Sequence, residues 1–297
     1  MKIVITFLLI ISSFTGFGQI VRIDSTTHWK KGLTFGLNLN QASFSSNWKA
    51  GGVNSIGLSS LFNYKANYKK DKNSWDNEID LMFGFVNNQG QGYRKTQDRI
   101  YLDTKYSHDI SEKWSLFTAL SFSTQFTEGY IYNDDDTQDL ISDIFAPAFI
   151  TSAWGMEYHP VPYFKVRLAP FAPRLTIVDQ PERFITTVGA NPYGVEPPDN
   201  LRTEWAAFQL QADFDKDIME NINLKWKYIL FANYETPEGK KIDHRLDLNL
   251  VAKVNQFVRV SFGGVLLYDY DQDTSVQLSQ SLTFGFAYVF RNYEEKK

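Results

Sequence analysis

The C-terminal segment 282–291 (LTFGFAYVFR) separates large aromatic side chains from small ones with a period of two residues. Side chains alternate across a strand, so Phe284, Phe286, Tyr288 and Phe290 share one face, while Thr, Gly, Ala and Val residues occupy the other. A soluble sheet would bury this aromatic face against a second layer. A membrane barrel would turn it toward lipid and headgroups. The segment therefore predicts a strand of one of these two folds.

The same alternation recurs along the chain and predicts about twelve strands, most of them longer than the ~9–11 residues that a tilted strand needs to cross a membrane. Connections after the first, third, fifth and seventh strands are long, and those after the second, fourth, sixth, eighth and tenth are short. Membrane barrels have short periplasmic turns and longer outer loops. We therefore predict an all-β, transmembrane, antiparallel up-and-down β-barrel. A secreted β-sandwich, whose strands are usually ~5–6 residues long, is the alternative. The long loops are expected at 43–52, 87–97, 128–146 and 179–201.

The N-terminus has the pattern of a secretory signal at residues 1–18, with Lys2, an apolar run at 3–11 and a small-residue region at 16–18. The run is too short for the ~20 residues of a spanning helix. We expect a periplasmic lead-in at 19–31, the barrel at 32–291 and a charged tail at 292–297.

The composition excludes several classes of function. The chain has no cysteine, which excludes disulfides, thiol catalysis, cysteine metal sites and a lipoprotein anchor. Its formal net charge is -4, which argues against nucleic acid as a partner, because nucleic acid needs a clustered basic face. No cofactor is implied.

Charged residues recur on the polar faces of the predicted strands. A charge facing lipid would be costly, so these side chains are expected to face the lumen. An ion-paired interior that holds the barrel's shape and a filter that binds a solute are both open interpretations. The residues are Asp76, Glu78, Asp80, Arg99, Asp103, Lys105, Lys225, Lys227, Arg245, Asp247 and Lys253.

No catalytic or metal site is predicted. The four histidines, at 28, 108, 159 and 244, have no metal-ligand spacing. Asp134–Asp136 with Asp139 offer carboxylates for calcium but lack the spacing of an EF-hand, and a solvated acidic loop is the alternative. A lipid hydrolase would need a serine near His244, and none lies within a few residues of it. We therefore expect the protein not to be an enzyme.

Four segments carry a resemblance to a known family: 40–52 (NQASFSSNWKAGG), 75–77 (WDN), 93–99 (YRKTQDR) and 142–148 (SDIFAPA). They resemble an uncharacterised family of Bacteroidota proteins, domain of unknown function 3078. The resemblance implies an outer-membrane or periplasm-facing β protein of a Gram-negative Bacteroidota species and supplies no activity or site residue. The last strand also resembles the closing strand of outer-membrane barrels.

Two of these segments suggest an outer-mouth motif. Trp48, with Gly51 and Gly52, lies in the first long loop, and Arg94 lies in the second. One hypothesis is that Trp48 stacks on Arg94 or covers the opening. The alternative is that Trp48 lies in the interfacial aromatic belt and the glycines only form the turn.

The sequence thus predicts a monomeric outer-membrane barrel that serves as a narrow pore or as a structural component with a charged lumen. An interaction or assembly subunit that docks a surface or export complex through its long loops is the alternative. The expected partners are outer-membrane lipids and other outer-membrane proteins.

Overall fold

The structure, a computed structural model, describes residues 28–43, 53–133, 137–236 and 238–293. The predicted signal at 1–18, the lead-in up to residue 27 and the tail from residue 294 lie outside these ranges. Trp48, Gly51, Gly52 and the acidic residues 134–136 also lie outside them.

Twelve antiparallel strands form one closed barrel, which confirms the predicted fold class. Each strand pairs with its neighbours along the chain, and β1 pairs with β16 to close the wall. The wall consists of β1 (Trp29–Ala42), β2 (Ser55–Lys70), β3 (Asn73–Asn88), β4 (Gly92–Asp109), β5 (Trp114–Thr124), β8 (Ala148–Val161), β9 (Phe164–Phe171), β12 (Ala207–Met219), β13 (Ile222–Asn233), β14 (Asp243–Lys253), β15 (Val258–Asp269) and β16 (Asp273–Arg291).

Two short strands extend the wall beyond β9 and β12. β10 (Arg174–Ile177) continues β9 along the edge of β8, and β11 (Leu201–Glu204) pairs with β10 and leads into β12. The seam between β8 and β9 contains two register shifts. At the first shift the backbones lie so close that a Cβ on Gly155 would be 1.9 Å from the Leu168 carbonyl oxygen. Only glycine fits at this position.

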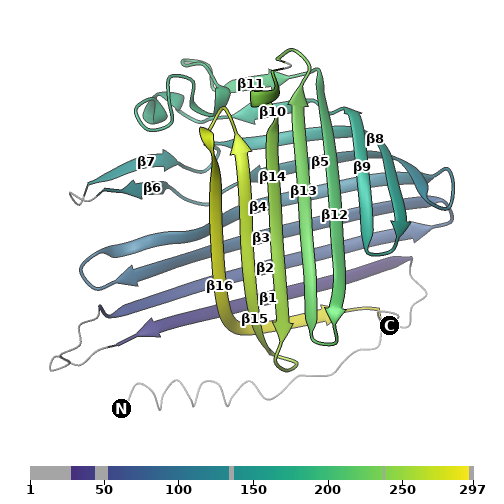
Figure 1. Ribbon diagram of the computed structural model, residues 1–297, viewed down its shortest axis with the longest axis horizontal. Coiled ribbons are helices and arrows are strands. Elements are labelled where there is room, and N and C mark those ends of the chain that lie inside the picture. The colour runs from purple at the N-terminus through teal and green to yellow at the C-terminus, as the bar shows by residue number, and fades with distance from the viewer. Residues whose placement is uncertain (1–27, 44–52, 134–136, 237, 294–297) are drawn as a thin grey trace.

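The two ends of the barrel differ. Short turns join β2–β3, β4–β5, β8–β9, β12–β13 and β14–β15, and we call this end the turn end. The other connections lie at the opposite end, the loop end. In Figure 1 the steep strands β12–β16 cross in front of the flatter strands β1–β5, as the tilt of strands in a barrel requires.

Burial alternates along the wall strands as the sequence pattern predicts. In β5, Leu116 and Leu120 point outward and are exposed, whereas Ser115, Phe117 and Ala119 are buried on the inner face. The exposed face of the wall therefore carries large apolar side chains, which suits contact with lipid. Among the described residues, no helix is long and apolar enough to cross a membrane.

The prediction of a long loop at 87–97 is wrong. β3 and β4 continue as a paired hairpin to Asn88 and Gly92, so the connection is only residues 89–91. Gly90 and Gly92 have φ values of +87° and +71°, and they allow this tight turn. β1 also begins three residues earlier than predicted, at Trp29, because residues 29–31 pair with β2.

The two longest connections fold together into a structure that we call the cap, residues 128–133, 137–146 and 178–200. It contains the hairpin β6 (Gly129–Tyr132) and β7 (Gln138–Ser142) and the 3-10 helices η1 (Pro181–Phe184) and η2 (Pro192–Gly194). Another 3-10 helix, η3 (Gly239–Lys241), precedes β14. The cap has its own apolar core, formed by Ala146, Val178, Phe184, Tyr193 and Val195, with Leu140 and Val188 packed against it.

Candidate functional site

The candidate site is the barrel lumen, where the wall strands bring their polar faces together. The strand register places Asp76 opposite Lys105 on β3 and β4, and Lys227 between Asp213 and Asp247 on β12, β13 and β14. Directly opposed residues share a face, so these charges line one continuous surface.

Two ion pairs cross the full width of the barrel. Arg99 Nη1 on β4 lies 3.7 Å from Asp247 Oδ1 on β14, and Lys225 Nζ on β13 lies 3.8 Å from Glu78 Oε1 on β3. In each pair the two strands are six apart in either direction around the wall, and are therefore diametrically opposed. Such contacts are possible only when the side chains meet inside the lumen.

Tyr101 lies at the centre of this crossing. It projects from β4, is 8% exposed, and is contacted by two cations over its ring. The Lys227 ammonium from β13 lies 4.8 Å from the ring centroid, and the Arg99 guanidinium carbon lies 4.9 Å from it. Cation–π contacts of this kind hold a charged side chain over an aromatic face. Side chains from opposite walls therefore occupy the middle of the lumen.

A group of five charges, three of them buried, adjoins the crossing toward the turn end. Glu157 on β8 accepts hydrogen bonds from Lys105 Nζ at 2.6 Å and from Arg167 Nε at 3.0 Å. Lys105 also lies 3.3 Å from Asp76, and Arg167 lies 3.8 Å from Asp103. Lys105, Glu157 and Arg167 are 2%, 6% and 8% exposed. Buried charges must be paired and hydrogen-bonded, and this group meets that requirement.

Of the three remaining predicted residues, two have local partners. Asp80 accepts a hydrogen bond from the Asn63 amide at 2.9 Å, and Arg245 donates two to Asp247 at 2.8 Å. Lys253, the last residue of β14, is exposed at the turn end. All eleven residues of the predicted lumen set are thus located. The structure brings Asp76, Asp103 and Lys105 together in the buried group, and Arg99 and Asp247 in the crossing.

Several charged residues of the lumen were not predicted from the sequence. Lys65, Glu157, Arg167 and Asp213 lie among the lumen charges, and Lys65 is 3.6 Å from Glu78. The sequence did contain a signal for Arg167, because Lys165 and Arg167 alternate with Phe164, Val166 and Leu168. The lumen charges of β3 and β4 were predicted from the same kind of alternation.

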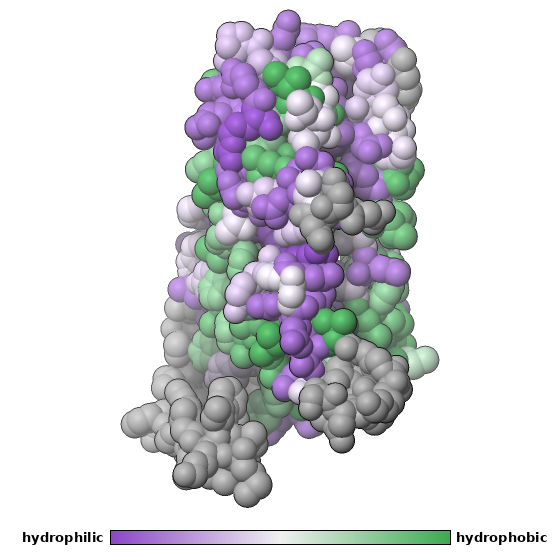
Figure 2. Space-filling model, turned by 90° about the vertical axis from the view of Figure 1, so that its left-hand side faces the viewer, coloured by the Kyte–Doolittle hydropathy of each residue, from purple (hydrophilic) through white to green (hydrophobic). Residues whose placement is uncertain are grey.

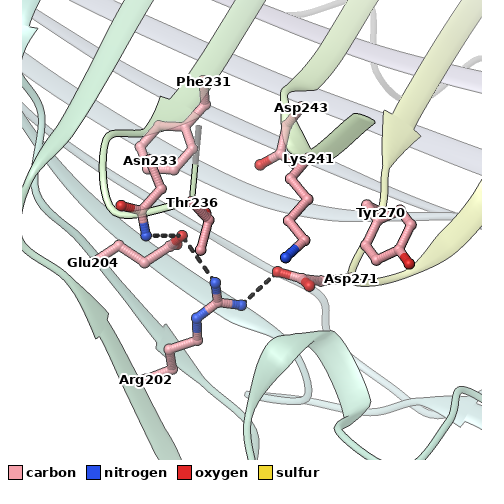
Figure 3. Close-up of a pocket in the computed structure, with 9 residues that line it drawn as sticks. All are labelled: Arg202, Glu204, Phe231, Asn233, Thr236, Lys241, Asp243, Tyr270 and Asp271. Atoms are coloured by element: carbon pink, nitrogen blue, oxygen red, sulfur yellow. Dashed lines mark hydrogen bonds and ion pairs between the residues drawn. The ribbon is translucent and has the colours of Figure 1, made fainter. Parts of the chain in front are cut away.

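Each end of the lumen network contains a cavity. At the turn end a cavity of about 140 Å³ is lined by residues that include Asp76, Lys105, Asp109 and Glu157. At the loop end a cavity of about 70 Å³ lies between β11, β13 and β14 (Figure 3). There the Arg202 guanidinium contacts Asp271 and donates to Glu204 at 3.2 Å, while the Lys241 ammonium points toward Asp271.

The outer-mouth motif is only partly described. The guanidinium carbon of Arg94 lies 4.2 Å from the ring centroid of Tyr132 on β6, so the described aromatic partner of Arg94 belongs to the cap. Trp48, Gly51 and Gly52 lie outside the described residues, and their roles stay predictions. Figure 2 shows the side of the molecule that carries β6 and β7, where hydrophilic residues run down the middle with apolar residues on either side.

Arg183 of η1 anchors the two halves of the cap to each other. Its guanidinium donates to Asp143 at 2.8 Å and to Glu128 at 3.0 Å. The hydrogen bond to Asp143 raises the pKa of Arg183. Thr187 and Tyr193 donate to the Leu140 and Ile141 carbonyls, and burial raises the pKa of the Tyr193 phenol. The two long connections therefore form one unit.

His244 contacts a tyrosine of the neighbouring strand. Its Nδ1 atom lies 2.7 Å from the Tyr228 hydroxyl, on the neighbouring strand β13. Within the described ranges, no group of three or more His, Asp or Glu residues is arranged to hold a metal ion. The possible calcium ligands Asp134–Asp136 lie outside those ranges.

The fold and the inward charges define the class as a transmembrane β-barrel. The model of a family described as a protein of unknown function, DUF3078, matches residues 39–130. No curated protein matches the sequence.

Many solved structures are similar to the chain, and three of them are described here. An outer membrane channel from Pseudomonas putida F1 is 9% identical with a TM-score of 0.42, and the match covers 89% of this chain and 96% of that one. The NanC porin is 7% identical with a TM-score of 0.39, and the match covers 86% of this chain and 98% of the porin chain. The translocator domain of the autotransporter NalP from Neisseria meningitidis is 11% identical with a TM-score of 0.35. The match covers 90% of this chain and 89% of the translocator chain.

Proposed function

We propose that the protein is an outer-membrane barrel of a Gram-negative Bacteroidota bacterium, with a lumen closed by its own side chains, and that it serves as a structural or assembly component. The observation that carries this proposal is the pair of contacts between opposed strands, Arg99 with Asp247 and Lys225 with Glu78. A diffusion pore needs a continuous water path, and these contacts lie across it.

The size of the barrel and the charges in its lumen also support a lumen that stays closed. Barrels of ~8 strands are filled by side chains, whereas those of 16–18 strands leave an aqueous channel. This barrel of twelve strands lies between the two sizes. Long Arg, Lys and Tyr side chains fill the additional space in its lumen. Paired charges inside a low-dielectric wall are costly to separate, so the closure resists spontaneous opening.

A narrow pore is the second candidate. The cavities at the two ends of the network and the presence of charges of both signs favour it, because small ions would pass if the crossing pairs exchanged partners. Catalysis is not part of the proposal. The cap would offer other outer-membrane proteins a folded surface, and the apolar wall would contact outer-membrane lipids.

Solute-driven swelling of liposomes that contain the refolded protein separates the two candidates. We expect background swelling in a small sugar for the wild type. The triple variant Arg99→Ala, Tyr101→Ala, Lys227→Ala should swell clearly faster, because it removes the side chains that meet at the centre. Lys69→Ala, at the exposed rim of the turn end, is the matched control and should stay at background. Fast swelling of the wild type would refute the closed lumen.

A further inference from the structure

The two edges of β16 are paired to different extents. On one edge β16 pairs with β15 from Phe286 to Asp273. On the other edge it pairs with β1 over only seven positions, from Arg291 to Gly285, whereas β1 and β2 are paired over fourteen. Residues 273–284 therefore have β15 on one side, and no strand in the described part of the chain on the other.

Gly285 marks the point where β1 and β16 separate. A Cβ at this position would lie 2.0 Å from Asn38 Oδ1 and 2.6 Å from the Leu37 carbonyl oxygen, so only glycine allows the approach. Beyond it, residues 39–42 of β1 continue to pair with β2 but not with β16. The wall thus divides at a fixed residue, and the open edge runs from there to the loop end.

The open edge lacks the features that normally prevent strands from pairing. Proteins protect exposed edges with charged residues, especially lysine, with proline, or with bulges. Residues 274–290 contain no charged residue and no proline. The register shift between β15 and β16 lies at the tip, between Leu267 and Asp269, and leaves residues 277–284 regular.

The surroundings of this edge require a hydrogen-bonding partner. Val276, Leu278 and Leu282 point outward and are 65%, 66% and 71% exposed, so this edge borders the lipid-facing surface of the wall. Backbone N–H and C=O groups in hydrocarbon must be paired, and acyl chains offer neither donors nor acceptors. The inward side chains, Gln277, Ser279, Ser281 and Thr283, are polar but uncharged.

We propose that residues 273–284 of β16 form a docking edge for one extended segment of a second protein, which adds a strand to the wall beside β16. The segment would carry apolar residues toward lipid and small uncharged polar residues toward the lumen, to match the alternation of β16. The length of the edge suits a single strand, because ~9–11 residues span a membrane. This inference deepens the assembly role given under the proposed function and rests on it.

A synthetic capped peptide of about ten residues, alternating valine and serine, serves as the probe. It is added to the refolded protein in lipid nanodiscs, and backbone amide hydrogen exchange is followed by NMR. Alternate amides between residues 273 and 284 should exchange fast without peptide and roughly tenfold more slowly with it. Protection should stop at Gly285. The amides of β15, which has strands on both sides, are the internal control and should not change.

The matched control peptide is N-methylated at every second residue, on the edge that would face β16. It keeps the apolar side chains but lacks the donors, so it should give no protection. Equal protection by both peptides would overturn strand addition in favour of apolar insertion. Slow exchange before any peptide would also overturn it. A dimeric mass would then favour a second copy of the protein, and a monomeric mass would favour a segment of the same chain. No change with either peptide would also overturn it. These exchange rates report on the edge of β16 and do not depend on whether the lumen is closed. A negative result would therefore not be confused with failure of the closed-lumen proposal.

Discussion

Replacing Arg167 with methionine should destabilise the barrel more than any substitution of an exposed charge. The guanidinium is buried, donates to Glu157 at 3.0 Å and lies 3.8 Å from Asp103. Methionine keeps much of the length of the side chain but removes both polar contacts. The substitution therefore isolates the charge from the packing.

The expected loss follows from what each partner retains. Glu157 keeps its hydrogen bond from Lys105 at 2.6 Å, so it remains paired. Asp103 loses its ion-pair contact with Arg167. A hydrogen bond to a charged group contributes ~1.5–3 kcal/mol, and breaking a buried ion pair costs ~3–5 kcal/mol. We expect the free energy of unfolding to fall by about 3 kcal/mol, at the lower end of the second range, because one of the two carboxylates stays satisfied.

Urea unfolding in lipid vesicles, followed by tryptophan fluorescence, measures this loss. Lys69→Met is the matched control. Its ammonium lies 2.5 Å from Asp109, but the Lys69 side chain is 51% exposed, and exposed pairs contribute at most ~1 kcal/mol. Equal losses for the two variants would refute the claim that the lumen group is buried.

Three further outcomes follow from the structure. Phe184→Ala removes a fully buried ring from the cap core and should make residues 178–200 sensitive to protease, while the heat-dependent gel mobility of the barrel stays unchanged. Leu248→Arg, at the middle of β14 on its lipid face, should cost ~2–4 kcal/mol in urea unfolding, whereas the neighbouring lumen variant Asn249→Arg should cost much less. Gly285→Val should prevent β1 from closing onto β16 and reduce the yield of refolded, heat-modifiable barrel, because its Cβ would collide with the backbone of Leu37.

The sequence predicts the fold well because a period of two residues determines which face each side chain occupies. Asp76, Glu78 and Asp80 alternate with uncharged residues, most of them apolar, and this pattern indicated an inward face before any contact was known. The charges that would meet could not be predicted in this way. Arg99 and Asp247 are far apart in the chain and on opposed strands, and their contact depends on the three-dimensional shape of the barrel.

The cap and the open edge also escaped sequence reasoning, for different reasons. Phe184 and Tyr193 lie in a segment without periodicity, so their packing into a core gave no local signal. The open edge of β16 depends on pairing between residues near the two ends of the chain. Leu282 and Phe284 alternate with small residues, and this pattern is the same whether one edge of the strand is paired or both edges are.

Single-channel recording of the purified, refolded wild-type barrel in a planar bilayer tests the closed lumen most directly. With a closed lumen, protein whose folded state is shown by its heat-dependent gel mobility should give no discrete conductance steps. The triple variant at Arg99, Tyr101 and Lys227 should give steps. Discrete steps from the wild type, with an ion selectivity that changes in Asp247→Lys, would contradict the closed lumen and establish an open, charge-lined pore.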